Sequence, residues 1–314
     1  MRIGLMVEAQ SGLTWSRWFE ILALAERLGF PTVLRSDHYF IGRQQDSLEA
    51  FLSFVPAALE TSSIRFGPLT SPVMFRRPVE AGRMAAQLSQ LSGGRFVLGL
   101  GVGWSRDEHL AYGIDFPEPA ERFQRLAEAL HVIRLLWREG PSFFDGRYSR
   151  LRGANCLPKP PRGRVPIVVG GSSEDYTLRI AARYGDEWNA LNLTPDECRQ
   201  RRTALARHCD EIGRDPSTIA TSVYPFGWVG KDEAMLDRAT RRAMEVVGLP
   251  DGIPPARFRD AARERGWIIG TTDEVVDNLG RLAEAGVDEV QFNCWSNETA
   301  EYLAADVVPA VAAF

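Results

Sequence analysis

Short apolar runs alternate with longer amphipathic runs along nearly the whole chain, and no other feature limits the fold as strongly. A short apolar run predicts a buried strand, whereas apolar residues three and four positions apart predict a helix. Strands are predicted over 2–8, 32–36, 64–70, 95–100, 165–169, 187–191, 218–229 and 287–292. Helices are predicted over 15–28, 49–60, 77–91, 119–138, 173–184, 195–212, 232–247, 273–285 and 297–312. We expect a loop with a short hairpin over 139–165 and irregular structure with one short helix over 249–271.

Strands that alternate with helices favour an α/β fold with a parallel sheet. Because many strand runs are continuous in Val, Ile and Leu, we expect both faces of the sheet to be covered. Eight such strands predict a (β/α)8 barrel, and a two-lobed Rossmann enzyme is the competing architecture. No change of composition and no Gly/Ser linker divides the chain, so we expect a single domain over residues 1–314.

The charge balance and the cysteines exclude several classes of protein. The chain has 37 Lys and Arg against 41 Asp and Glu, a net charge of −4 that gives no bulk attraction to nucleic acid or an anionic membrane. No window approaches the ~18 apolar residues of a membrane span, so we expect a cytoplasmic protein. Four scattered cysteines predict buried reduced thiols, and no zinc-ligand spacing or Gly-x-Ser-x-Gly elbow is present.

Polar residues directly after the predicted strands are the candidates for a site, because barrel enzymes act at the carboxyl ends of their strands. Asp37 and His38 follow the second strand. A histidine can transfer protons near neutral pH, and a neighbouring carboxylate can accept a hydrogen bond from a cofactor ring. The alternative is that His38 only fixes the loop that follows it.

Two glycine-rich segments follow later strands. Gly170-Gly171-Ser172-Ser173 lets a ligand approach the backbone at a helix start, which suits an anion such as phosphate. The alternative is a plain turn in which the serines cap the next helix. Gly99-x-Gly101-x-Gly103 lacks the third glycine of a dinucleotide fingerprint, so we interpret it as room for a flat ring at the barrel mouth.

Taken together, these segments resemble the luciferase-like monooxygenase superfamily. The resemblance rests on Arg-Ser-Asp-His-Tyr at 35–39, Gly-Leu-Gly-Val-Gly-Trp at 99–104, Val-Val-Gly-Gly-Ser at 168–172 and the linking stretches at 112–122 and 178–186. It spans the chain from the first strand to the last helix. The resemblance implies an eight-stranded barrel with an irregular insertion near strand seven, and a homodimer.

The resemblance also implies a cofactor. Branches that use FMN typically carry Glu-His-His after strand two, whereas branches that use coenzyme F420 typically carry Ser-Asp-His. This chain has Ser36-Asp37-His38, which favours F420 and leaves FMN as the alternative.

Site residues are implied by position in the family. His38 and Asp37 would lie at the reacting centre, with Asp37 also bonding the ring. The residues that would hold the cofactor are Leu69 and Ser71 behind the ring, Gly101 and Gly103 beside the tail, and Val169, Gly170, Gly171 and Ser172 around the phosphate, with help from Thr177. The family often has a cis peptide bulge after strand three, here within 68–72. Trp104 stands where sugar-phosphate dehydrogenases of the family have a glutamate, so we expect another substrate.

The expected function is therefore an F420-dependent oxidoreductase that moves a hydride between the deazaflavin and a small-molecule substrate. One alternative is an FMN-dependent monooxygenase that uses O2 and a separate flavin reductase. Another is a cofactor carrier without catalytic activity, since a fold does not fix a function.

Overall fold

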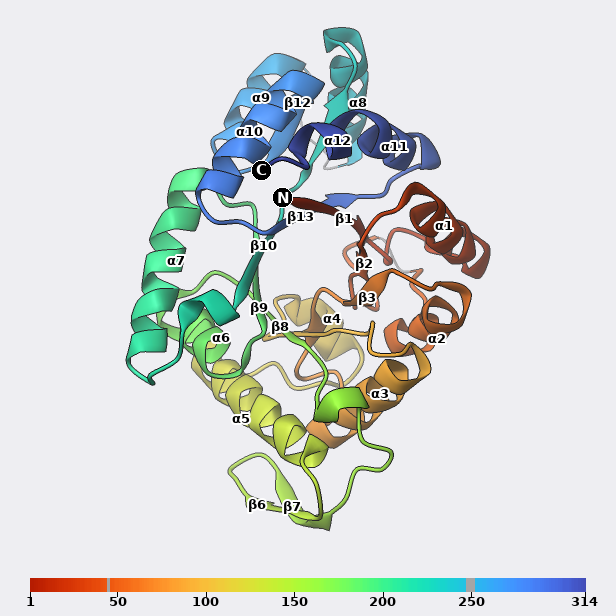
Figure 1. Ribbon diagram of the computed structural model, residues 1–314. Helices are drawn as coiled ribbons and strands as arrows, with labels where there is room; N and C mark the ends of the chain where they lie inside the picture. Colours follow the sequence, from red (N-terminus) through yellow and green to blue (C-terminus); the bar gives the residue numbers. More distant parts are fainter. Residues whose placement is uncertain (44–45, 247–251) are drawn as a thin grey trace.

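The computed structural model describes residues 1–43, 46–246 and 252–314, and its centre is a parallel sheet curled into a barrel (Figure 1). The strand order is β3-β2-β1-β13-β10-β9-β8-β5-β4, and a parallel bridge from Phe66 to Phe96 brings the two ends together. The bounds are β1 (Arg2–Val7), β2 (Thr32–Arg35), β3 (Arg65–Pro68), β4 (Ser71–Pro72), β5 (Leu98–Gly101), β8 (Ile167–Gly170), β9 (Glu187–Leu191), β10 (Ala220–Tyr224) and β13 (Glu289–Asn293). The predicted barrel is confirmed; β3 falls within the strand predicted over 64–70, whereas β4 begins directly after it and was not predicted.

Helices surround the barrel, as Figure 1 shows. They are α1 (Trp15–Leu28), α2 (Ala50–Glu60), α3 (Pro78–Leu91), α5 (Pro119–Trp137), α6 (Arg179–Tyr184), α7 (Pro195–Asp210), α10 (Thr272–Glu284), α11 (Asn297–Tyr302) and α12 (Val308–Val311). Threonines cap the first turns of two of these helices: Thr14 caps α1 by accepting from the Arg17 amide, and Thr194 forms a capping box with Glu197 at α7. No helix in the described residues is long and apolar enough to span a bilayer.

Side chains alternate along each strand between the barrel interior and the helices. The layer between barrel and helices is apolar and contains Trp18, Phe54 and Trp137, which are almost fully buried. The interior is divided. Met6, Leu34, Leu69, Val97, Val168 and Tyr224 form an apolar cluster inside the barrel, whereas β9, β10 and β13 contribute polar groups. There, Asn189 donates to Ser222 at 2.8 Å and to Gln291 at 3.1 Å.

An excursion after β10 corresponds to the insertion expected near strand seven. The single strand predicted over 218–229 is wrong: Pro225, which lacks an N–H, follows β10, and the chain leaves the barrel as β11 (Gly227–Gly230). β11 pairs in parallel with β12 (Ile268–Thr271), a strand missed within 249–271. α8 (Glu233–Val246) and α9 (Pro255–Arg263) complete the excursion. Positions 247–251 of the predicted elements lie outside the described residues.

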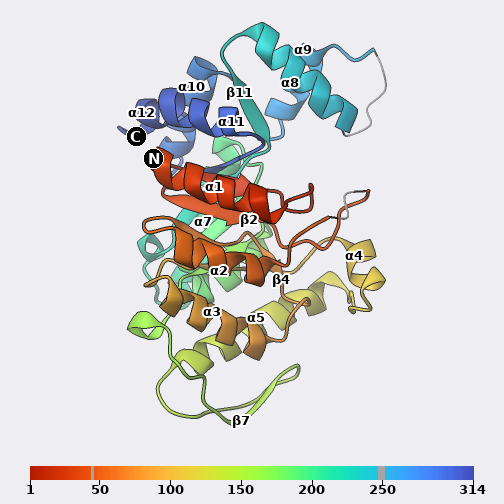
Figure 2. The ribbon, with the colours of Figure 1, turned by 90° about the vertical axis from the view of Figure 1, so that its right-hand side faces the viewer.

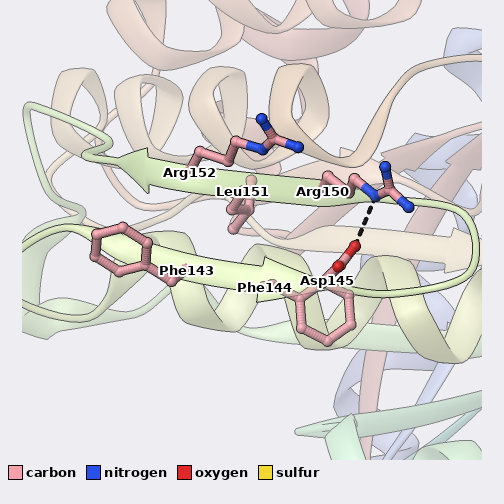
Figure 3. A pocket seen from close by; sticks show the side chains of 6 residues that line it. All are labelled: Phe143, Phe144, Asp145, Arg150, Leu151 and Arg152. Atoms are coloured by element: carbon pink, nitrogen blue, oxygen red, sulfur yellow. Dashed lines mark ion pairs between the residues drawn. The ribbon is translucent and has the colours of Figure 1, made fainter.

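The hairpin expected within 139–165 is confirmed as β6 (Ser142–Asp145) and β7 (Arg150–Ala154). Glu128 of α5 accepts hydrogen bonds from the backbone amides of Arg147 and Tyr148, so the hairpin turn is attached to that helix. Figure 3 shows a shallow hollow beside the strands, lined by Phe143, Phe144, Asp145, Arg150, Leu151 and Arg152. None of the predicted site residues lies there.

Candidate active site at the barrel mouth

The loops that leave the carboxyl ends of the strands gather at one end of the barrel. In Figure 2 the loop after β2 and the short helix α4 (Arg106–Ala111) lie on one side, and the two chain termini lie on the other. Because the strands are parallel, the residues after each of them share this edge. The side chains predicted from separate strands therefore belong to one end of the molecule.

His38 is held by a buried carboxylate. Its Nδ1 lies 2.9 Å from Oε2 of Glu108, a residue of α4 that is fully buried. The other oxygen of Glu108 accepts from the backbone amides of Tyr39 and Phe40, so one carboxylate fixes both the ring and the loop after it. The same contacts are compatible with the alternative, in which His38 only fixes the loop that follows it, and proton transfer by His38 stays a prediction. Nε2 of His38 has no partner in the described residues.

Asp37 is 2% exposed and forms an ion pair with Arg76, which precedes α3. Arg76 also contacts Glu49 and donates to Oγ of Ser71 at 3.1 Å, and its guanidinium lies over the Phe51 ring. Burial opposes the charge of Arg76, but the two carboxylates raise the pKa of the guanidinium above its ordinary value. Asp37 and Ser71, both predicted as site residues, thus share one cation.

A second group of hydrogen-bonded side chains lies where β1 ends and is centred on the carboxylate of Glu8. The hydroxyl of Tyr224 donates to Oε1 of Glu8, and Nε2 of Gln10 donates to Oε2 of Glu8 at 2.5 Å. Ser36 donates to Oε1 of Gln10 at 2.6 Å, which links the ends of β1 and β2. Burial and then the Glu8 charge raise the pKa of Tyr224 well above its ordinary value, so this phenol stays protonated. No cation forms an ion pair with Glu8 in the described part of the chain.

The chain turns sharply between β3 and β4, where the Leu69–Thr70 peptide bond is cis. The cis bond expected within 68–72 is confirmed. Thr70 occupies space left by glycines: an added Cβ would lie 2.5 Å from its side chain at Gly101 and 2.6 Å from it at Gly170. At Gly99 an added Cβ would lie 2.0 Å from the Pro68 carbonyl. The absence of a side chain at these glycines therefore lets the segment between β3 and β4 pack against them. A role of Gly101 in cofactor binding stays a prediction.

Gly103 has φ +73 and lies against His109, which is fully buried and would be 3.0 Å from an added Cβ. Nδ1 of His109 lies 2.7 Å from the Ser105 carbonyl, and Nε2 has no partner in the described residues. Burial lowers the pKa of His109, so the ring is neutral at pH 7. The space beside Gly103 is thus filled by the imidazole of His109. A position of Gly103 beside the cofactor tail stays a prediction.

The segment after β8 presents backbone amides. Gly171 has φ +129, a conformation that favours glycine, and donates its own amide to the Asn189 carbonyl. The amides of Ser172 and Ser173 have no acceptor in the described residues. The alternative, in which a serine caps the next helix, is wrong for Ser173, which precedes a π-helical turn over Glu174–Leu178 and makes no side-chain cap hydrogen bond. The two free amides leave the segment able to bind an anion.

Val169 differs from its neighbours, because its side chain packs in the layer between barrel and helices. Any contact from Val169 to a ligand at the mouth would have to come from its backbone. Thr177 is buried beside Gly171, and an added Cβ on that glycine would lie 2.9 Å from Oγ1 of Thr177.

Aromatic side chains form a rim beside His38. The Trp104 ring is 67% exposed and stands edge-on to the His38 ring, with 5.6 Å between centroids. Tyr39 stacks on Phe75 at 4.4 Å and contacts Tyr112, which is 60% exposed, at the same distance. Large exposed aromatic groups beside a protonatable ring are suited to binding a flat, apolar molecule.

Four residues of this mouth were not singled out from the sequence: Glu8, Arg76, Glu108 and Tyr224. Glu8 directly follows the first strand, and strand-end position was the signal that could have identified it. Arg76 and Glu108 lie 39 and 70 residues from their partners Asp37 and His38. No local pattern predicts such pairings.

Comparisons with known proteins identify the family. Residues 1–289 match the family model described as luciferase-like monooxygenase. The chain is 34% identical over 318 residues to an F420-dependent glucose-6-phosphate dehydrogenase of Intrasporangium calvum, covering 91% of each chain. It is 32% identical over 257 residues to an F420-dependent hydroxymycolic acid dehydrogenase of Mycobacterium tuberculosis, covering 79% of this chain and 70% of the relative.

Solved structures share the fold. An F420-dependent secondary alcohol dehydrogenase in complex with an F420-acetone adduct superposes with a TM-score of 0.81 at 22% identity, covering 99% of this chain and 98% of the other. A type II Baeyer-Villiger monooxygenase of Pseudomonas putida in complex with FMN gives 0.76 at 18% identity, covering 98% of each chain. By its match to the family model over nearly its full length and by its barrel, this chain belongs to the luciferase-like monooxygenase family.

Proposed function

We propose that this chain is an F420-dependent oxidoreductase that moves a hydride between carbon 5 of the deazaflavin and a small organic substrate. One observation carries the proposal: a histidine with a free Nε2 is fixed by buried Glu108 at the mouth of a barrel whose sequence relatives include F420-dependent dehydrogenases. Asp37, in the Ser36-Asp37-His38 segment, lies directly beside it.

The residues at the mouth fit such a cofactor. The free amides of Ser172 and Ser173 and the glycine conformation at 171 suit a phosphate, and Gly170 lies in the same segment. Leu69 belongs to the apolar cluster inside the barrel and would lie behind the ring, with Ser71 beside it. When bound, a deazaflavin supplies or accepts the hydride, whereas the protein provides orientation and electrostatics.

His38 is the proton-transfer group in this proposal. Glu108 favours a proton on Nδ1, because a carboxylate accepts a hydrogen bond, and this leaves Nε2 to face the mouth. Asp37 is buried and paired with Arg76, so its role is to bond the ring and to place negative charge beside it, not to carry protons.

Anaerobic titration with both cofactors tests the proposal. We expect the F420 absorbance and fluorescence to change at micromolar protein and FMN to bind more weakly. A protein that binds FMN tightly and not F420 would reverse the choice of cofactor. A monooxygenase relative favours this second candidate: 4-hydroxyprotoasukamycin monooxygenase is 28% identical over 298 residues. Oxygen consumption with reduced FMN would identify it.

The chain is also proposed to be a single-domain cytoplasmic homodimer. All four cysteines are buried and unpaired, as a reducing compartment permits. α2 is apolar on both faces: Leu52 and Leu59 are more than 60% exposed on the side away from its buried residues. A surface helix that is apolar all round suits a covered position. Light scattering should show a dimer that Leu52→Glu with Leu59→Glu dissociates, whereas Phe143→Glu on the hairpin leaves it intact.

A further inference from the structure

The aromatic rim beside His38 carries a conclusion about the substrate. Trp104 and Tyr112 are more than half exposed, yet each contacts a ring of the mouth: Trp104 contacts His38 and Tyr112 contacts Tyr39. Phe40 extends the same surface, with its centroid 6.3 Å from that of Tyr112. These side chains come from the loop after β2 and the segment after β5, so they approach His38 from two directions. Exposed aromatic surface of this extent marks a binding site for an apolar partner.

The charges beneath the rim argue against an anionic substrate. Carboxylates of Glu8, Asp37, Glu49 and Glu108 lie at this edge. The two guanidiniums that lie among these carboxylates are committed: Arg76 pairs with Asp37 and Glu49, and Arg35 is fully buried and donates to Ser53, Leu48 and Ser36. Arg43 and Arg106 also lie on the two loops, but they are exposed to solvent and form no ion pair in the described residues. Burial lowers the pKa of Arg35 to about 10. A phosphorylated substrate at this edge would meet unpaired negative charge on Glu8.

We propose that Trp104, with Tyr112 and Phe40, is the specificity surface for the substrate, and that this substrate is a neutral, planar, apolar enone. The inference rests on the proposed function. In the step, a hydride from the reduced deazaflavin forms a C–H bond at the β-carbon while the C=C bond opens to an enolate. The α-carbon then takes the proton from Nε2 of His38. The enone gains two electrons and becomes a saturated ketone, the deazaflavin loses two, and the proton it releases restores His38 through solvent.

Steady-state kinetics with two enones test this surface. Benzylideneacetone carries an aryl ring that can stack on Trp104, whereas 2-cyclohexen-1-one undergoes the same reduction without one. We expect Trp104→Ala to raise KM for benzylideneacetone about tenfold with kcat nearly unchanged, the loss expected for one aromatic contact. The KM for 2-cyclohexen-1-one should change less than threefold, and Trp104→Phe should restore most of the affinity for benzylideneacetone. Glucose 6-phosphate should not be oxidised.

A binding measurement without turnover separates the rim from the cofactor. Benzylideneacetone should quench the tryptophan fluorescence of the cofactor-free protein, and Trp104→Ala should remove this quenching. Trp15→Ala, which removes a partly exposed tryptophan at the start of α1, should retain it. The affinity for F420, followed by its own fluorescence, should stay within twofold in both variants.

The outcomes distinguish the two proposals. A wild-type protein that binds reduced F420 but reduces neither enone, or that oxidises glucose 6-phosphate, overturns the substrate class and leaves the cofactor proposal standing. Equal effects of Trp104→Ala on both enones, or a large loss of F420 affinity, overturn the role of Trp104. A wild-type protein that binds no F420 overturns the proposed function, while the quenching result still decides whether the rim binds an aryl enone.

Discussion

The two sides of the barrel mouth are built in different ways. The side formed by the ends of β1, β2 and β5 depends on side chains that meet across long stretches of sequence, such as His38 with Glu108. The side formed by the end of β8 depends on a short backbone segment around Gly171, whose neighbours offer free amides. The difference suggests a division of labour, with proton transfer on the first side and anchoring of the cofactor on the second. Substitutions on the two sides should therefore change different quantities.

Removing the imidazole should have the largest effect. We expect His38→Ala to lower kcat by about 10²- to 10⁴-fold, the usual contribution of a positioned acid or base. The affinity for F420 should change little, because the proposed phosphate contacts lie on the other side. Stopped-flow reduction and a fluorescence titration measure the two quantities. His131→Ala on α5, where the ring packs on Phe144, is the control and should leave both unchanged. Unaltered turnover in His38→Ala would remove the proton-transfer role.

A smaller effect is expected from the carboxylate behind the histidine. Glu108→Gln keeps an oxygen that can accept from the Tyr39 amide but loses the charge that orients His38. We expect kcat to fall roughly 10- to 100-fold, as for other residues that orient a functional group through a hydrogen bond. The affinity for F420 should change little, because Glu108 bonds His38 and the amides of the loop after it, and not the segment after β8. If Glu108 were only structural, Glu108→Gln would lower thermal stability without lowering kcat.

The two sides also differ in how much of their structure could be predicted from the sequence. The strand and helix pattern is local, so the barrel and most elements were predicted, and the motif at 36–38 placed Asp37 and His38 correctly at a strand end. The pairings of Asp37 with Arg76 and of His38 with Glu108 were not predicted, because they depend on how distant loops meet. The break between β10 and β11 was missed because 218–229 has a continuous strand-like composition despite Pro225. The π-helical turn over Glu174–Leu178 was not predicted, because the sequence of 173–184 has the residue spacing of an ordinary α-helix.

The backbone side should respond through cofactor affinity. Gly171→Ala places a Cβ 2.9 Å from Oγ1 of Thr177 at a φ that side chains rarely adopt. We expect the segment to shift, at a cost of about 1–3 kcal/mol, and the dissociation constant of F420 to rise about tenfold. Gly213→Ala is a matched control, because Gly213 also has a positive φ but no atom near its missing Cβ. It should lower the melting temperature while leaving F420 binding unchanged; equal loss of binding in both variants would contradict an anchoring role for Gly171.

A carboxylate at the opposite end of the barrel should affect stability alone. Glu289 starts β13, is 1% exposed and lies 3.1 Å from Arg2; burial and then Glu187 raise its pKa above the ordinary value of 4.5. The folded protein therefore holds this proton more tightly than the unfolded chain does, and its free energy of unfolding falls as the pH rises above 4.5. Glu289→Gln does not lose stability in this way, so its free energy of unfolding relative to the wild type should increase as the pH rises above 4.5, with kcat unchanged.

Asp215 should give the opposite sign. Hydrogen bonds from Ser217 lower the pKa of Asp215. Asp215→Asn should therefore be less stable than the wild type at neutral pH, and the difference should vanish as the pH falls below the lowered pKa. Urea unfolding from about pH 2 to pH 8 checks both signs. A change of kcat in Glu289→Gln would mean that the polar interior affects the chemistry at the mouth.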